Sequence, residues 1–222
     1  MKMNKISDLS IGLVGSHRVG KTTLLDSLQS KLPDLNVVYA EVSSANFWYD
    51  IDIKTDDHLC FAERLKVQQL VMKHISKKIR NLRSGFRSLK TGFIIDRTPI
   101  DVLGYTYSNT DDTTSNLFNR EVQELQDEAR YLLNYFDVLI FLYPGIETLV
   151  SPSTLHIPGK DSKKFKSRIY RDALSNSMLG LCYRLKSTTL TLIVVPEEII
   201  DLEERTLYIS NSLSKVNLDD SI

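Results

Sequence analysis

The sequence has little cysteine, no net charge and no long apolar run, and each shortage excludes a class of protein. Cys60 and Cys182 are the two cysteines in 222 residues, and their spacing fits neither a zinc site nor a Cys-x-x-Cys motif. We expect both to be reduced thiols in the core. The 28 basic residues balance 28 acidic ones, so no overall field draws the chain to nucleic acid or to an anionic membrane.

No apolar run reaches the roughly 18 residues that a membrane span needs, and the first ten residues lack the apolar region of a signal peptide. We therefore expect a soluble, cytoplasmic protein with no membrane partner. Hydrophobic residues make up 42% of the chain and charged residues 25%, as in ordinary folded domains. The length suits a single α/β domain over residues 1–222.

Short aliphatic runs predict five strands, at 9–15, 36–40, 92–96, 138–143 and 190–195. Helical patterns fill the intervals, at 21–32, 61–82, 98–108, 116–136, 165–186 and 197–212. The runs are nearly continuous rather than alternating, as expected when helices cover both faces of a parallel sheet. We predict a three-layer α/β/α fold with a parallel sheet of about five strands. The long irregular loop after 144 predicts a lid region at about 145–171.

Residues 15–22, GSHRVGKT, match the phosphate-binding pattern G-x-x-x-x-G-K-[ST], with a predicted strand before and a helix after. We expect the loop amides and the start of the helix to hold the phosphates of ATP, Lys21 to contact the outer phosphates and Thr22 to bind Mg²⁺. We expect His17 and Arg18 to be solvated. The predicted nucleotide-binding residues are Gly15, Ser16, Val19, Gly20, Lys21, Thr22 and Thr23.

A GTPase would also carry N-K-x-D late in the chain. Here NKIS at 4–7 precedes the first strand and has no aspartate. The D-x-x-G match at 101–104 falls after Pro99 in a predicted helix rather than at a strand end. These contexts disfavour a GTPase.

Charged residues follow two further strands at the edge where parallel α/β sheets bind ligands. Glu41 follows the second strand, and Asp96 and Arg97 follow the third. Carboxylates and an arginine beside a triphosphate suit Mg²⁺ binding and activation of an attacking hydroxyl. We predict catalytic roles for all three residues, with Asp96 as a metal ligand; a surface carboxylate and an ordinary ion pair are the alternatives.

The phosphate loop, Glu41 and the DRTP segment together resemble the P-loop nucleoside and nucleotide kinases, especially the ribosylnicotinamide-kinase-like domains and the phage-type deoxynucleotide kinases. EVSSANFW is similar to a segment of deoxynucleoside kinases, although Val42 replaces their proline. The resemblance implies strand order 2-3-1-4-5 and a carboxylate at Glu41 that orients or deprotonates the acceptor. It also implies that Asp96 acts through Mg²⁺ and its waters and that Arg97 contacts phosphates.

The helix predicted after the second strand borders the acceptor in such kinases. Gln68 falls near the centre of its apolar stripe and Arg64 on the flank, so we predict that both contact the acceptor base; structural roles are the alternative. Phe47, Trp48 and Tyr105 are candidates for stacking on or bordering the base, with core packing as the alternative.

Basic residues crowd the segment 159–174, where Arg168 and Arg171 share one helical face. We expect this arm to close over the triphosphate and neutralise charge on the transferred phosphoryl group; a solvated basic helix is the alternative. A second basic cluster at 77–90 could track nucleic-acid phosphates. The neutral chain argues against a nucleic-acid partner.

We therefore expect ATP- and Mg²⁺-dependent phosphoryl transfer to a small acceptor, a nucleoside or a nucleoside monophosphate. Two alternatives remain open: a kinase acting on the 5′ end of a polynucleotide, and an ATPase or binding module without a small acceptor. A homodimer also remains open.

Overall fold

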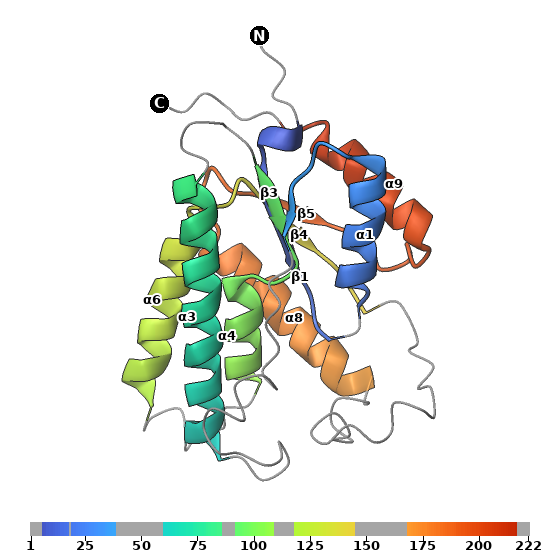
Figure 1. The fold of residues 1–222 in the computed structure, drawn as a ribbon. Helices are drawn as coiled ribbons and strands as arrows, with labels where there is room; N and C mark the ends of the chain where they lie inside the picture. The colour runs from blue at the N-terminus through green and yellow to red at the C-terminus, as the bar shows by residue number, and fades with distance from the viewer. Residues whose placement is uncertain are drawn as a thin grey trace, which may run out of the picture.

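The computed structural model describes residues 6–17, 19–38, 60–85, 92–108, 118–144 and 168–216. They form a five-stranded parallel sheet in the order β2-β3-β1-β4-β5 (Figure 1). The strands are β1 (Ser10–Val14), β2 (Val37–Val38), β3 (Phe93–Ile95), β4 (Val138–Phe141) and β5 (Thr191–Val194). The predicted sheet and its strand order are confirmed.

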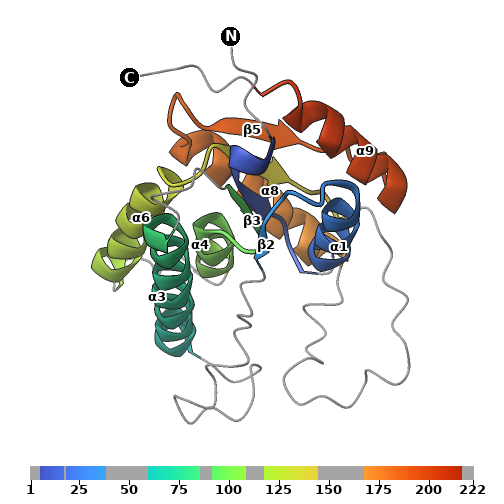
Figure 2. The same ribbon diagram turned by 45° about the horizontal axis from the view of Figure 1, so that its top comes forward.

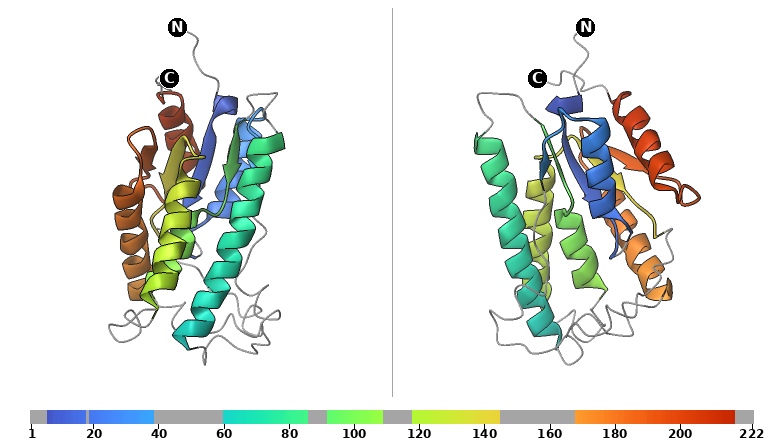
Figure 3. Two further views of the ribbon diagram at one scale, coloured as in Figure 1. Left: turned by 90° about the vertical axis from the view of Figure 1, so that its left-hand side faces the viewer. Right: turned by 45° about the vertical axis from the view of Figure 1, so that its right-hand side comes forward.

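Helices cover both faces of the sheet. The order of the helices is η1 (Ile6–Asp8, a 3-10 helix), α1 (Lys21–Lys31), α3 (Phe61–Gly85), α4 (Pro99–Tyr107), α6 (Asn119–Leu133), α8 (Arg168–Leu185) and α9 (Leu202–Leu213). Helices α1 and α9 lie on one face, and α3, α4 and α6 on the other (Figures 2 and 3). Helix α8 packs against α4 and joins the core of the second face. The three-layer fold is confirmed.

The central strands bury side chains on both faces. In β4, Leu139 and Phe141 pack into the core under α3, α4, α6 and α8, whereas Val138 and Ile140 pack into the core under α1 and α9. All four are fully buried. Because successive side chains point to opposite faces, a strand covered on both sides needs an unbroken apolar run, and such runs predicted these strands.

Local contacts move some boundaries away from the predictions. The last helix begins at Leu202 rather than 197, because the Asp201 carboxylate accepts hydrogen bonds from the backbone N–H groups of Glu203 and Glu204 and caps the helix there. The prediction that both thiols are buried is wrong for Cys60, which is exposed just before α3, where its N–H donates to the Glu63 carboxylate. Among the helices of the described ranges, none is both long and apolar enough to cross a membrane.

Candidate active site

The phosphate loop turns from β1 into α1 at the carboxyl edge of the sheet. Gly20 has φ 86°, in the left-handed region that favours glycine, immediately before α1 begins. A Cβ on Gly15 would lie 2.9 Å from both the Leu142 carbonyl oxygen and Val19 Cγ2, so only glycine fits. The two glycines of the motif are thus required by the turn and by close packing.

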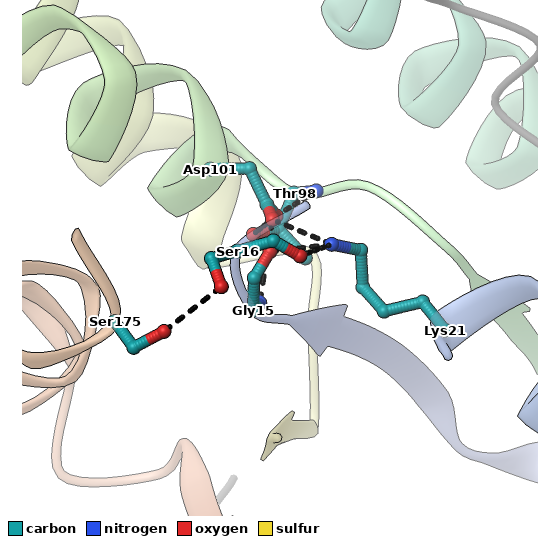
Figure 4. Close-up of polar contacts among 6 residues, drawn as sticks. All are labelled: Gly15, Ser16, Lys21, Thr98, Asp101 and Ser175. Carbon is teal, nitrogen blue, oxygen red and sulfur yellow. Dashed lines mark hydrogen bonds and ion pairs between the residues drawn. The ribbon is translucent and has the colours of Figure 1, made fainter. Parts of the chain in front are cut away.

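The Lys21 ammonium group reaches back across the loop. It donates to the carbonyl oxygens of Gly15 and of Ser16, the second at 3.1 Å, and its Nζ lies 3.5 Å from Asp101 Oδ1 (Figure 4). Burial lowers the pKa of this ammonium group, and the Asp101 carboxylate opposes that shift. A cation is therefore fixed at the loop where the motif predicts the outer phosphates.

The other predicted nucleotide-binding residues lie just before and just after Lys21 in the sequence. Ser16 and Val19 are buried in the loop, whereas Thr22 and Thr23 are exposed in the first turn of α1. That turn has N–H groups without partners inside the helix and is the positive end of its dipole. The positive end of α1 therefore lies at the loop, where the motif predicts the phosphates.

The segment after β3 lies near the same lysine. Asp96 and Arg97 are both half-buried. Burial and the Asp101 carboxylate have the largest effects on the pKa of Lys21. Two smaller effects follow: the charge of Arg97 lowers this pKa, and the charge of Asp96 raises it. The structure thus brings the predicted carboxylate–arginine pair within electrostatic range of the phosphate loop.

Helix α8 contacts the loop from the other side. Ser175 Oγ donates to Ser16 Oγ at 3.0 Å, and both side chains are buried (Figure 4). Arg171 lies one turn earlier on the same side of α8 and is 9% exposed. Its Nε and Nη1 have no hydrogen-bond partner among the described residues.

Arg171 was predicted to belong to a lid, but the structure places it in a helix packed against α4. Arg168 is the first residue of that helix. The remainder of the predicted lid lies outside the described residues. Arg171 therefore lies on the buried face of α8, one turn before the serine that contacts the loop.

Tyr105 of α4 packs against His17 of the phosphate loop. Tyr105 is buried on α4, and its ring centroid lies 4.6 Å from that of His17. Burial raises the pKa of the Tyr105 phenol well above its usual value, so the hydroxyl stays protonated. The expectation that His17 is solvated is wrong: its ring is half-buried because it packs on Tyr105.

The apolar stripe predicted on α3 is buried as expected, at Phe61, Leu65, Met72, Ile75 and Ile79. Gln68 is only half-buried, as is Arg64. Val67 and Val71 are buried as well, each 2% exposed. At 100° per residue, Gln68 and Arg64 therefore lie within the buried face of the helix, although neither is fully buried. Glu41, Phe47, Trp48 and Arg18 lie outside the described residues.

Asp101, Ser175 and Arg205 were missed as functional residues. Asp101 had a local signal, because Thr98-Pro99-Ile100-Asp101 has the spacing of a capping box at the start of a helix. Ser175 had no such signal.

Arg205 of α9 donates hydrogen bonds to the phosphate loop and to two other connecting segments. It is 3% exposed and donates to the Ile199 carbonyl at 2.6 Å, to Val19 at 3.0 Å and to Tyr143 at 3.4 Å. Burial lowers the pKa of its guanidinium group. Each carbonyl belongs to a different connecting segment, so no local sequence pattern reveals this role.

The predicted magnesium ligands fit the metal in chemistry. Thr22 and Asp96 offer the oxygen donors that Mg²⁺ prefers, and Mg²⁺ at nucleotide sites uses one or two protein oxygens together with phosphates. Within the described ranges, no three histidine, cysteine or acidic side chains gather as a preformed metal centre.

No protein-family model and no curated protein sequence matches the chain. Solved structures do match. One, the deoxyadenosine kinase from M. mycoides with bound dATP, has a TM-score of 0.60 at 21% identity, covering 93% of this chain and 100% of that one. Another structure of that kinase, with the products dCMP and a flexible dCDP, has a TM-score of 0.54 at 20% identity, covering 94% and 100%. The chain thus has the P-loop nucleoside kinase fold.

Proposed function

We propose that the protein transfers the γ-phosphoryl group of ATP, with Mg²⁺, to a nucleoside or a nucleoside monophosphate. The observation that carries this proposal is the set of cations around the phosphate loop. Lys21 is held at the loop by hydrogen bonds, and Arg97 lies within electrostatic range of it. Arg171 is a buried residue of α8, and two of its nitrogens have no hydrogen-bond partner among the described residues. The fold shared with a kinase crystallised with nucleotides supports this reading.

In this proposal the loop amides and Lys21 hold the donor phosphates. Arg97, Arg168 and Arg171 neutralise the charge that develops as the phosphoryl group moves. Thr22 and Asp96 would hold Mg²⁺, which would supply further charge stabilisation on the phosphates. Catalysis then depends mainly on positioning, with closure of the loop at 145–168 excluding water.

The acceptor binds beside the donor. Glu41 orients or deprotonates its hydroxyl group. Arg64, Gln68 and Tyr105 border the base, with Phe47 and Trp48 available for stacking.

The test is a panel of nucleosides, nucleoside monophosphates and a short oligonucleotide with a free 5′ hydroxyl, scored for ADP release. We expect a mononucleoside or monophosphate to be the best acceptor and Lys21→Ala to abolish turnover. Lys31→Ala, at the exposed end of the same helix, is the matched control. Glu41→Gln should keep ATP binding and lose the acceptor-dependent rate.

Preference for the oligonucleotide would indicate a polynucleotide end kinase. ADP release that no acceptor stimulates would indicate an ATPase module. Normal activity in the Glu41 variant would show that the base is another residue.

A further inference from the structure

Asp101 is a buried carboxylate that the proposed mechanism does not use. It lies in the first turn of α4 and is 2% exposed. Burying a carboxylate is costly unless both oxygens find hydrogen-bond donors or cations. The partners of Asp101 therefore indicate what the residue is for.

The two oxygens of Asp101 serve different segments. Oδ2 accepts from the Thr98 backbone N–H and from the Thr98 hydroxyl, each at 2.8 Å, and so caps α4. Oδ1 faces the phosphate loop, where it accepts from the Gly15 N–H at 3.3 Å and lies 3.5 Å from Lys21 Nζ (Figure 4). A helix cap needs only the first set of contacts. The second set serves the loop.

Asp101 completes the surroundings of the Lys21 ammonium group. An ammonium group has three N–H donors, and here three acceptors lie close to it: the carbonyl oxygens of Gly15 and Ser16 and the Asp101 carboxylate. Lysine has a flexible four-carbon side chain, and a side chain ordered before binding loses less entropy when a ligand arrives. The lysine is thus in place before any phosphate binds.

We propose that Asp101 is a positioning residue that fixes Lys21 and the Gly15 amide relative to the segment carrying Asp96 and Arg97. The inference rests on the proposed function, in which this loop binds ATP. Thr98, which Asp101 also holds, follows Arg97 directly in the chain. One carboxylate therefore ties the donor side of the site to the segment after β3. Three N–H and O–H donors and the Lys21 ammonium group together compensate its charge, so an approaching phosphate meets little repulsion.

A double-mutant cycle tests the link to the lysine. ADP binding is measured by calorimetry in EDTA for the wild type, Asp101→Asn, Lys21→Met and the double variant. Asp101→Asn should weaken ADP binding about tenfold in the wild-type chain but less than about twofold in the Lys21→Met background, because coupled residues are non-additive. Failure of the wild type to bind ADP would contradict the proposed function rather than this inference.

Thr98→Val is the matched control for helix capping. It removes one donor to Oδ2 and leaves the contact between Oδ1 and Lys21. We expect it to lower stability while ADP affinity stays within about twofold of the wild type. Three results would each overturn the proposal. Thr98→Val could weaken ADP binding as much as Asp101→Asn does. Asp101→Asn could weaken ADP binding by the same factor in the wild-type chain and in the Lys21→Met background, or it could bind ADP more tightly than the wild type.

A second measurement does not require Asp101→Asn to fold. Lys21→Met leaves the buried Asp101 carboxylate without its cation, so the urea midpoint of the nucleotide-free protein should fall relative to Lys31→Met. Equal midpoints for the two lysine variants would show that the ion pair does not hold the site together.

Discussion

At the scale of one residue, Arg171 is where the stability of the chain and the proposed binding of a polyphosphate oppose each other. Its guanidinium group is 9% exposed, and two of its nitrogens lack a hydrogen-bond partner among the described residues. A buried charge without compensation destabilises a folded chain, and such groups persist where a ligand supplies the missing partner. A polyphosphate on the neighbouring loop would be that partner.

Arg171→Met should therefore raise the free energy of unfolding of the nucleotide-free protein by about 1 kcal/mol, because an apolar side chain of similar length fits the site without a charge. The same change should remove most of the stabilisation that ADP gives. Urea denaturation with and without ADP measures both effects. Lys186→Met, exposed immediately after α8, is the control and should stay within about 0.5 kcal/mol. Lower stability in Arg171→Met would show that the guanidinium group is satisfied within the protein.

At the scale of elements, the packing of α4 against α8 aligns the two helices that carry Asp101 and Arg171. Gly104 of α4 faces the fully buried Met178 of α8. A Cβ at Gly104 would lie 2.5 Å from Met178 Cγ and 2.8 Å from its Cε. The glycine lets the helices approach closely.

Gly104→Ala should destabilise the protein by about 1–3 kcal/mol, because the added methyl group overpacks a buried contact. Gly180→Ala is the matched control, since nothing lies within 4 Å of its added Cβ and α8 would gain helix propensity of up to about 1 kcal/mol. Urea denaturation of the two variants should move in opposite directions. A stable Gly104→Ala would mean that Met178 can move aside without loss.

The elements themselves were largely readable from the sequence. Strands covered on both faces require unbroken apolar runs, and these predicted the five strands and their parallel arrangement. The order of the strands was predicted from the resemblance to P-loop kinases and not from the runs. The ends of helices and strands were harder to predict, because they depend on single contacts, such as the Asp201 carboxylate that caps α9. Gln68 lies within the apolar face of α3, as its spacing predicted, but is only half-buried. Periodicity identifies the inward face of a helix and does not say how completely other segments cover each position on it.

At the scale of the whole molecule, the site is assembled from segments far apart in the chain. The loop contacts Asp101 across 86 residues, Ser175 across 159 and Arg205 across 186. A motif predicts a role for its own residues, such as Lys21, but not which distant side chains support them. The place of the loop between β1 and α1 was therefore predictable, and the distant residues that contact it were not.

The two thiols report on this assembly as a whole. Cys60 is exposed, whereas Cys182 is fully buried on α8, where burial raises the pKa of its thiol. A maleimide should therefore label one thiol readily in the native protein, and the second only as the chain opens. The second rate thus measures the stability of the core that packs α8 against the sheet.

ADP at about 100 times its Kd stabilises a folded chain by about 2.7 kcal/mol, so labelling of Cys182 should slow about 100-fold when opening is in fast equilibrium. The measurement is the labelling rate at Cys182, followed by mass spectrometry. In Lys21→Ala, ADP should no longer slow the labelling of Cys182, because ADP would no longer bind and stabilise the folded chain. Rapid labelling of both native thiols would contradict the packing of α8. Undiminished protection in Lys21→Ala would place nucleotide binding away from the phosphate loop.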